Sequence, residues 1–335
     1  MSLRLLLIAL IPLLSFNASA QYTNLVLEGG GMKGIAYAGA FEVLDSLGIS
    51  KDIQQIAGTS SGAMNGMMFA LGYTGKEIRQ LNLNTNFGKY NQVGVPFFGG
   101  LLRIRKTYGY YKTDRFITDL GKMIMAKGYS KDLTFGELHQ AKLAGQSVKL
   151  LYVTGANLTD QKIEIFSHET YPNMKILDAV RISISIPVYF EALFMQPDGS
   201  LIEKKDADST TKVMVDGGIL DNYPFYLFDT LVTVNNGANS YYKCNVHTLG
   251  LKLETDNSTK DISPRDIQKT SDFMEAFSLM SSEYLNRRFL GPQQISQTVF
   301  INVQDFNPKV KKQKDDVKIK VMNYGKEATI SFFSK

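Results

Sequence analysis

Short apolar segments alternate with segments of helical periodicity along most of the chain, and this alternation limits the possible folds more than any other feature. The apolar segments that predict strands are 24–28, 53–57, 148–154, 161–166, 212–216, 246–252 and 298–303. Helical segments lie between them at 33–47, 62–71, about 174–183 and about 265–287. Strands separated by helices form a mainly parallel sheet with helices on both faces. We therefore predict an α/β fold, with ligands bound beyond the carboxyl ends of the strands.

Three segments do not fit the alternation. Residues 84–112 are rich in Gly, Asn and Tyr, and residues 196–211 are polar enough to predict a surface excursion. The tail over 309–320 mixes lysines with two aspartates, which favours a solvated charged face. Its lysines are Lys309, Lys311, Lys312, Lys314, Lys318 and Lys320.

The N-terminal segment, residues 1–20, has the pattern of a secretory signal. Arg4 is its only charge, Leu5–Phe16 is apolar, and Ala18-Ser19-Ala20 supplies small residues before Gln21. An apolar run of roughly a dozen residues is too short for a membrane anchor, which needs about 20. We predict export to the periplasm or the exterior, with cleavage before Gln21.

Charge and cysteine content narrow the possible partners. The chain has 37 Lys and Arg against 32 Asp and Glu, a net charge of +5. This mild excess favours anionic surfaces, but the basic residues are scattered among acidic ones, so no nucleic-acid partner is predicted. The single Cys244 cannot form an internal disulfide. Composition leaves the oligomeric state open.

A glycine-rich loop follows the first predicted strand, in the sequence LVLEGGGMKG at 25–34. The spacing Gly29-x-Gly31-x-x-Gly34 matches a dinucleotide-binding fingerprint, which makes a dinucleotide-binding protein one alternative. That fingerprint also needs an acidic residue at the end of the second strand. The available residue, Asp52, precedes the second strand instead.

A G-x-S-x-G pattern ends the second predicted strand, where Gly58-Thr59-Ser60-Ser61-Gly62 leads into a helical segment. At a strand-to-helix junction, this pattern predicts a sharp turn that exposes the central serine as a nucleophile. The helix that follows directs its N-terminal amides toward that serine. Ser60 therefore takes the nucleophile position, and Ser61 is the better candidate for a simple helix cap.

A third glycine loop, Asp216-Gly217-Gly218, follows the strand that contains Val213–Val215. A serine nucleophile needs a base, and the chain has only three histidines. Of these, His139 and His168 are predicted to be surface residues. His247 would complete a Ser60–Asp216–His247 triad in the order of an α/β-hydrolase, which is the second alternative. However, no loop containing a histidine follows the strand 246–252, so a Ser60–Asp216 dyad is the better interpretation.

The three loops together, in this order, resemble the patatin-like phospholipase family. The segments GYYKTDRFITDL (109–120), ILDAVRISISIPVYFEAL (176–193) and DGGILDNYPF (216–225) also resemble blocks of that family, so the resemblance covers nearly all of 21–335. The sequence departs from the family pattern at two places. Lys33 stands where many members carry Arg, and Asp216 is followed by Gly-Gly where others have Gly-Ala.

The resemblance implies one acyl hydrolase domain over 21–335 with a three-layer α/β/α fold. It implies a Ser–Asp dyad that cleaves lipid acyl esters as a phospholipase A or lysophospholipase, without a cofactor or metal. Ser60 would be the nucleophile and Asp216 the base. The glycine loop would be the oxyanion hole, with the N–H groups of Gly30 and Gly31 as the main donors.

The resemblance leaves supporting roles for the remaining loop residues. Gly29 and Lys33 belong to the same predicted oxyanion loop, with Lys33 either adding positive charge near the oxyanion or lying in solvent. The glycines that support the motifs are Gly34, Gly58, Gly62, Gly217 and Gly218. Asp221, the other nearby carboxylate, is predicted to be structural.

The segment 96–112, PFFGGLLRIRKTYGYYK, mixes apolar and basic residues. A basic, aromatic loop of this kind suits an enzyme that docks on an anionic lipid surface. The alternative is that its apolar residues join the core while the basic ones face water. The acyl position and head group of the substrate are not determined by the sequence.

Overall fold

The computed structural model describes residues 21–91, 104–234, 239–255, 267–268, 290–304, 306 and 310–334. Two predicted features therefore lie outside the described residues. The first is the export signal over 1–20, and the second is nearly all of the helix expected over 265–287. Within the described ranges, no helix combines the length and apolar character needed to cross a bilayer.

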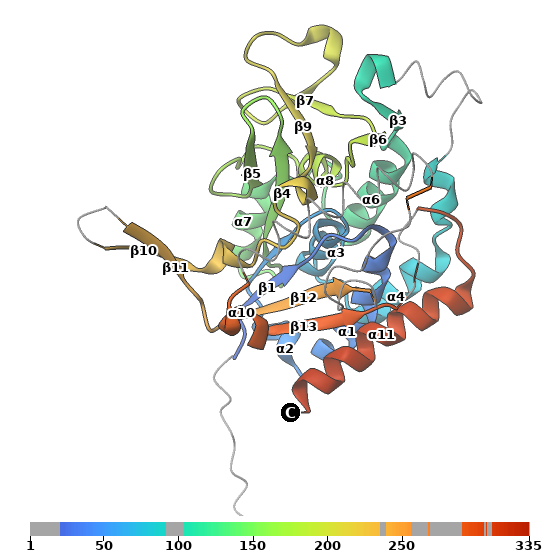
Figure 1. Cartoon of the computed structure of the whole chain (residues 1–335), viewed down its shortest axis with the longest axis vertical. Helices are drawn as coiled ribbons and strands as arrows, with labels where there is room; N and C mark the ends of the chain where they lie inside the picture. The colour runs from blue at the N-terminus through green and yellow to red at the C-terminus, as the bar shows by residue number, and fades with distance from the viewer. Residues whose placement is uncertain are drawn as a thin grey trace, which may run out of the picture.

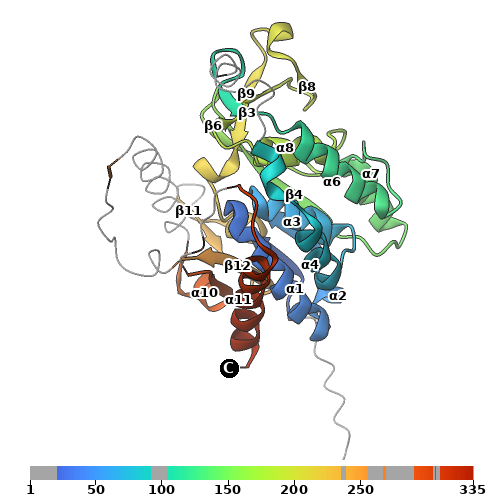
Figure 2. The same cartoon turned by 90° about the vertical axis from the view of Figure 1, so that its right-hand side faces the viewer.

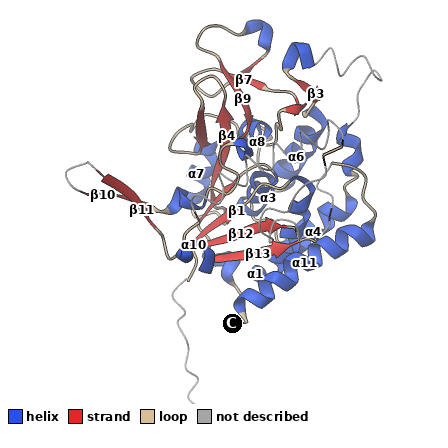
Figure 3. Ribbon diagram, viewed as in Figure 1, coloured by secondary structure: helices blue, strands red, loops and turns tan. Residues whose placement is uncertain are grey.

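A nine-stranded sheet forms the centre of the described structure, in the order β13-β12-β1-β2-β4-β9-β7-β8 with β5 also paired to β4 (Figures 1 and 3). The run from β13 to β4 is parallel throughout, as the alternating sequence pattern predicts. The parallel strands are β1 (Asn24–Leu27), β2 (Gln55–Gly58), β4 (Leu150–Asn157), β12 (Thr248–Glu254) and β13 (Thr298–Asn302).

The remaining strands of the sheet are antiparallel to their neighbours. They are β5 (Lys162–Phe166), β7 (Leu193–Met195), β8 (Leu201–Ile202) and β9 (Lys212–Asp216). The sequence pattern located β5 and β9 but not β7 and β8. Strands of three and two residues are too short to show a repeating pattern of apolar positions.

The register of β4 brings the ends of β2 and β9 together. Gly58, the last residue of β2, pairs with Val153 of β4, and Asp216, the last residue of β9, pairs with Gly155. Strand β5 pairs with the other edge of β4, since Val153 also pairs with Phe166 and Gly155 also pairs with Glu164. Strands β2 and β9 therefore share one edge of β4 and point their carboxyl ends at each other.

The larger part of the core lies on one face of the sheet. Leu25 and Leu27 point into it, whereas Val26 between them packs on the opposite face, as the two-residue period of a strand requires. Figure 2 shows the helices on the larger face side by side. They are η1 (Gly31–Ala36), α1 (Tyr37–Ser46), α3 (Ser61–Ala70), α4 (Gly75–Asn84), α6 (Asp114–Ala126), α7 (Phe135–Leu143), α8 (Ile176–Ser183) and α11 (Asp315–Phe333).

The opposite face carries a smaller apolar cluster in which Tyr223 and Phe225 cover Val26 and Ala57. Phe225 begins the short helix η5 (Phe225–Phe228). Beyond it, the hairpin of β10 (Thr230–Val234) and β11 (Asn239–Lys243) extends away from the body of the molecule (Figure 1). The remaining elements are short: α2 (Ile49–Asp52), η2 (Phe87–Asn91), β3 (Gly109–Tyr111), β6 (Val188–Phe190), η3 (Lys204–Asp206), η4 (Gly217–Ile219) and α10 (Pro292–Ser296).

The polar segment 196–211 is largely an exposed excursion as predicted, although it contributes the short strand β8. The prediction for the tail is wrong in one respect. Lys318 on α11 is only 3% exposed, and its Nζ donates to the carbonyls of Leu83 and Thr85 at 2.8 and 2.9 Å. Carbonyls at the end of a helix lack partners within that helix, so the ammonium group satisfies the C-terminal end of α4.

Replacing Lys318 with Met is therefore expected to lower the free energy of unfolding. The change removes a charged donor and leaves the carbonyls of Leu83 and Thr85 without their hydrogen bonds. We expect the free energy of unfolding to fall by about 2 kcal/mol. Chemical denaturation measures the difference. Lys320→Met is the matched control, because Lys320 is exposed on the same helix. Equal stability of the two variants would contradict the capping role.

Candidate active site

Ser60 lies in a sharp turn between β2 and α3. Its backbone has φ 53° and ψ −120°, which is a strained conformation for a residue with a side chain. The turn needs glycine on both sides, because a Cβ on Gly58 would lie 2.6 Å from the backbone of Gly62, and a Cβ on Gly62 would lie 2.2 Å from the Leu27 carbonyl. The predicted strand–turn–helix context of the G-x-S-x-G motif is thus present.

Neighbouring side chains hold this turn in place. The Ser60 N–H donates to Ser183 Oγ at 2.8 Å, at the end of α8. The Thr59 hydroxyl lies 2.6 Å from the Thr154 hydroxyl of β4 and 3.0 Å from the Asp221 carbonyl. Strain at a functional residue persists only where surrounding contacts fix it, and these bonds supply that restraint.

Asp216 faces Ser60 across the junction of β2 and β9. Its carboxylate accepts a hydrogen bond from the Gly218 N–H at 2.8 Å, and the Ser60 hydroxyl lies close enough to lower its pKa. The side chain is almost fully buried, and this desolvation raises its pKa to about 7, although the Gly218 N–H and the Ser60 hydroxyl lower it. A carboxylate with such a pKa is a far better proton acceptor near neutral pH than an ordinary aspartate.

The glycine loop at 29–31 passes beside the serine turn and is clamped there. Gly29 exchanges two hydrogen bonds with Asn222, whose carbonyl accepts from the Gly29 N–H at 3.0 Å and whose Nδ2 donates to the Gly29 carbonyl at 2.9 Å. The Gly30 N–H donates to Ser61 Oγ at 2.9 Å. Gly31 has a φ of 54°, in the region that favours glycine.

These bonds correct two predictions about the loop. The N–H groups of Gly29 and Gly30 already have acceptors in the protein, so of the three predicted glycine donors only Gly31 has no acceptor within the described part of the chain. Ser61 does not cap its own helix. Its hydroxyl instead accepts from Gly30, a residue that lies 31 positions earlier in the chain.

The family is determined by comparison with known proteins. A family model described as "Patatin-like phospholipase" matches residues 25–229, which is more than half of the chain. The chain belongs to the patatin-like phospholipase family. Membership of this family of lipid ester hydrolases agrees with the resemblance drawn from the three glycine loops.

Two curated relatives and one solved structure extend the comparison. Uncharacterized protein YqhO of Bacillus subtilis is 34% identical over 213 residues, which are 62% of this chain and 67% of that protein. "Probable lipid hydrolase 463L" of Invertebrate iridescent virus 6 is 27% identical over 297 residues, covering 79% of this chain and 91% of that protein. The crystal structure of VipD from Legionella pneumophila matches with a TM-score of 0.52 at 20% identity, covering 94% of this chain and 67% of VipD. That likeness supports the predicted patatin-like α/β fold with flanking helices.

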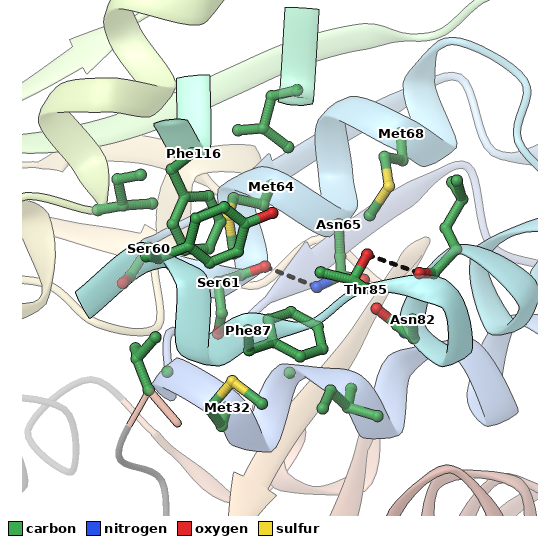
Figure 4. Close-up of a pocket in the computed structure, with 18 of the residues that line it drawn as sticks. Met32, Ser60, Ser61, Met64, Asn65, Met68, Asn82, Thr85, Phe87 and Phe116 are labelled. Atoms are coloured by element: carbon green, nitrogen blue, oxygen red, sulfur yellow. Dashed lines mark hydrogen bonds between the residues drawn. The ribbon is translucent and has the colours of Figure 1, made fainter. Parts of the chain in front are cut away.

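A largely apolar cavity opens beside Ser60. Figure 4 shows Ser60 toward one side of the cavity, with the side chains of Met32, Met64, Phe87 and Phe116 around its interior. Most of the lining comes from η1, α3, α4, η2 and α6, whose apolar side chains belong to the larger core cluster. Its other apolar members include Ile35, Met68, Leu81, Leu120, Met123, Ile184, Ile186, Phe190 and Val310.

Neither alternative to the dyad has its key residue at this site. His247 directly precedes β12 and is exposed, with its Nδ1 3.1 Å from the Gln21 carbonyl. Because β12 runs parallel to β1 and β2, the length of a seven-residue strand, about 20 Å, separates His247 from the carboxyl edge of the sheet. Asp52 likewise precedes β2 and lies at the far end from the glycine loop.

The other two histidines lie away from Ser60 but are not simple surface residues. His139 and His168 are both half-buried, with ring centroids 4.2 Å apart. Burial, together with the neighbouring His139, lowers the pKa of His168. The prediction that both are surface residues is therefore wrong, because α7 covers β4 and brings the two rings together.

Asp221 is buried close to the site without contacting the serine hydroxyl. Its carboxylate accepts from the Tyr226 hydroxyl, and burial raises its pKa to about 6. Its N–H donates to the Gly217 carbonyl at 2.8 Å, and its own carbonyl accepts from Thr59. These contacts fit the predicted structural role, in which Asp221 shapes the loop after β9.

Asn222, Ser183 and Thr154 contact the candidate site, and the sequence analysis did not single them out. Each contacts a motif residue from a distant part of the chain, and no local pattern marks such a residue. Lys33 flanks the loop, with its Cε 3.1 Å from where a Cβ on Gly30 would lie. Of the predicted docking segment 96–112, residues 96–103 lie outside the described residues.

Proposed function

We propose that the protein hydrolyses acyl esters of phospholipids or lysophospholipids with a Ser60–Asp216 dyad. The observation that carries the proposal is the position of Ser60, in a strained turn beside an apolar cavity and close enough to the buried Asp216 carboxylate for its hydroxyl to lower the pKa of that group. A nucleophile beside a base and a largely apolar cavity supports acyl transfer from a lipid.

In the first half of the reaction, Ser60 Oγ attacks the ester carbonyl carbon while Asp216 takes the hydroxyl proton. The raised pKa of Asp216 makes this transfer feasible near neutral pH. Asp216 then gives the proton to the departing alcohol oxygen, and the acyl group remains on Ser60. In the second half, Asp216 accepts a proton from water as the water oxygen attacks the acyl carbon. Asp216 then gives that proton to Ser60 Oγ as the acyl–Oγ bond breaks and the fatty acid leaves.

The carbonyl oxygen becomes negatively charged during each attack. We assign the Gly31 and Ser61 N–H groups as its donors, because neither has a protein acceptor among the described residues. Ser61 opens α3, so the helix dipole also favours an anion there. Preorganised donors of this kind contribute about 3–4 kcal/mol each to the transition state. Lys33 beside the loop adds positive charge.

The proposal is tested with purified protein and a panel of phospholipids, lysophospholipids and triglycerides, with products separated by acyl position. We expect release of fatty acid from at least one phospholipid or lysophospholipid. Added NAD(P) is expected to leave the melting temperature unchanged, because Asp52 is remote from the glycine loop. Absence of hydrolysis across the panel, with folded protein, would overturn the proposed activity.

His247→Ala separates the dyad from the triad. We expect this variant to hydrolyse ester at close to the rate of the unaltered protein, because His247 lies at the opposite end of the sheet from Ser60. A triad would lose on the order of 10⁴-fold in kcat. Steady-state kinetics on a soluble p-nitrophenyl ester measure the difference, and a loss of that size would refute the dyad.

A further inference from the structure

Two buried amide groups interrupt the apolar lining of the cavity. Asn65 on α3 and Asn82 on α4 both line it, and Figure 4 shows them on the side of Ser61 away from Ser60. Among the described residues that line the cavity, only these two have buried side-chain polar atoms without a hydrogen-bond partner. The atoms are Asn65 Oδ1 and Asn82 Nδ2.

The orientation of the Asn65 amide is fixed. Its Nδ2 donates to the Ser61 carbonyl at 2.8 Å, so the oxygen, which can only accept, is the atom left unpaired. The residue is 5% exposed, so bulk water does not reach this oxygen freely. A buried polar atom without a partner is unfavourable, which makes it a strong site for a ligand that supplies the partner.

We propose that this amide pair binds a hydroxyl group carried partway along the acyl chain of the substrate. A hydroxyl group has one donor and an acceptor oxygen, so it can donate to Asn65 Oδ1 and accept from Asn82 Nδ2. Asn65 follows Ser60 by five residues, which corresponds to about 7–8 Å along the helix. The hydroxyl therefore lies several carbons beyond the ester carbonyl. This inference rests on the proposed function, since it assigns the cavity to the acyl chain.

The preference is measured as a ratio of kcat/KM values within one protein. The probes are p-nitrophenyl stearate and a series of monohydroxystearates with the hydroxyl moved along the chain. We expect one position to be favoured over stearate by about tenfold, because a site built to bond a hydroxyl discriminates against the analogue that lacks it. The ratio should fall to about one in Asn65→Leu and in Asn82→Leu.

Asn84→Leu is the matched control, because Asn84 is exposed on the same helix as Asn82. It should keep the ratio of the unaltered protein. Asn82 makes no side-chain hydrogen bond within the described structure, so its variant tests the pair even if Asn65→Leu does not fold. A ratio near one at every hydroxyl position, or a ratio insensitive to Asn82→Leu, would overturn the proposal.

A binding measurement separates this inference from the catalytic one. In Ser60→Ala protein, free hydroxystearic and stearic acids compete with a fluorescent fatty acid for the cavity. We expect the hydroxy acid to compete about tenfold better, and Asn82→Leu to remove the advantage. If the unaltered protein hydrolyses the stearate ester but shows no hydroxyl preference, only the amide site is refuted. If Ser60→Ala protein binds the hydroxy acid selectively but the unaltered protein hydrolyses no ester, only the dyad is refuted. If neither acid binds, the amide site is refuted.

Discussion

Ser60→Ala is expected to abolish ester hydrolysis, with a loss on the order of 10⁴- to 10⁶-fold in kcat. The substitution removes the only atom that can form the acyl-enzyme bond, while the turn and the neighbouring donors remain. A fluorophosphonate probe, which reacts with activated serines, should label the unaltered protein at Ser60 and leave this variant unlabelled. Peptide mass spectrometry locates the label.

Ser61→Ala is the adjacent control for the same experiment. The Ser61 hydroxyl anchors the Gly30 N–H, so its loss should loosen the glycine loop and reduce kcat modestly, by about tenfold. Labelling at Ser60 should persist. Labelling or hydrolysis that survives Ser60→Ala would remove Ser60 as the nucleophile, and loss of labelling in Ser61→Ala alone would move that role to the neighbouring hydroxyl.

The sequence predicted the parts of the site that depend on local chain geometry. Glycines at 58 and 62 are required by contacts between a strand and the helix that directly follows it, so the motif is visible in a short segment. The place of Asp216, as the last residue of an apolar strand followed by two glycines, was predicted in the same way. Parallel strands then bring such loops to one edge of the sheet.

The parts that escaped prediction depend on contacts between distant segments. Asn222 binds Gly29 from a loop nearly two hundred residues later in the chain. The Gly30 N–H donates to Ser61 Oγ and is therefore not available to a ligand. Lys318 is buried only because α11 crosses the end of α4. The polar atoms of Asn65 and Asn82 are unpaired only in the folded cavity. No periodicity or motif in the sequence encodes these pairings.

Asp216→Asn is expected to reduce kcat on the order of 10⁴-fold, because the amide cannot accept the serine proton. The substituted side chain keeps the shape of aspartate. Its amide oxygen still accepts from the Gly218 N–H, and its amide nitrogen lies toward Ser60 Oγ. In the unaltered protein, kcat/KM should rise with pH through about 7, as the carboxyl loses its proton. The residual activity of the variant should lack that rise.

The same substitution is expected to stabilise the protein at neutral and higher pH. Burial raises the pKa of Asp216 from 3.8 to about 7, so between these values the folded state binds more protons than the unfolded state. Stability therefore falls as pH rises through this window, by about 4 kcal/mol in total. An uncharged side chain does not carry this cost. Denaturant unfolding at pH 5 and about pH 8 should show a gain for the variant that is about 2–3 kcal/mol larger at the higher pH. An equal effect at both pH values would mean that the carboxylate is not buried as a charge, and the dyad would lose the raised basicity on which its chemistry depends.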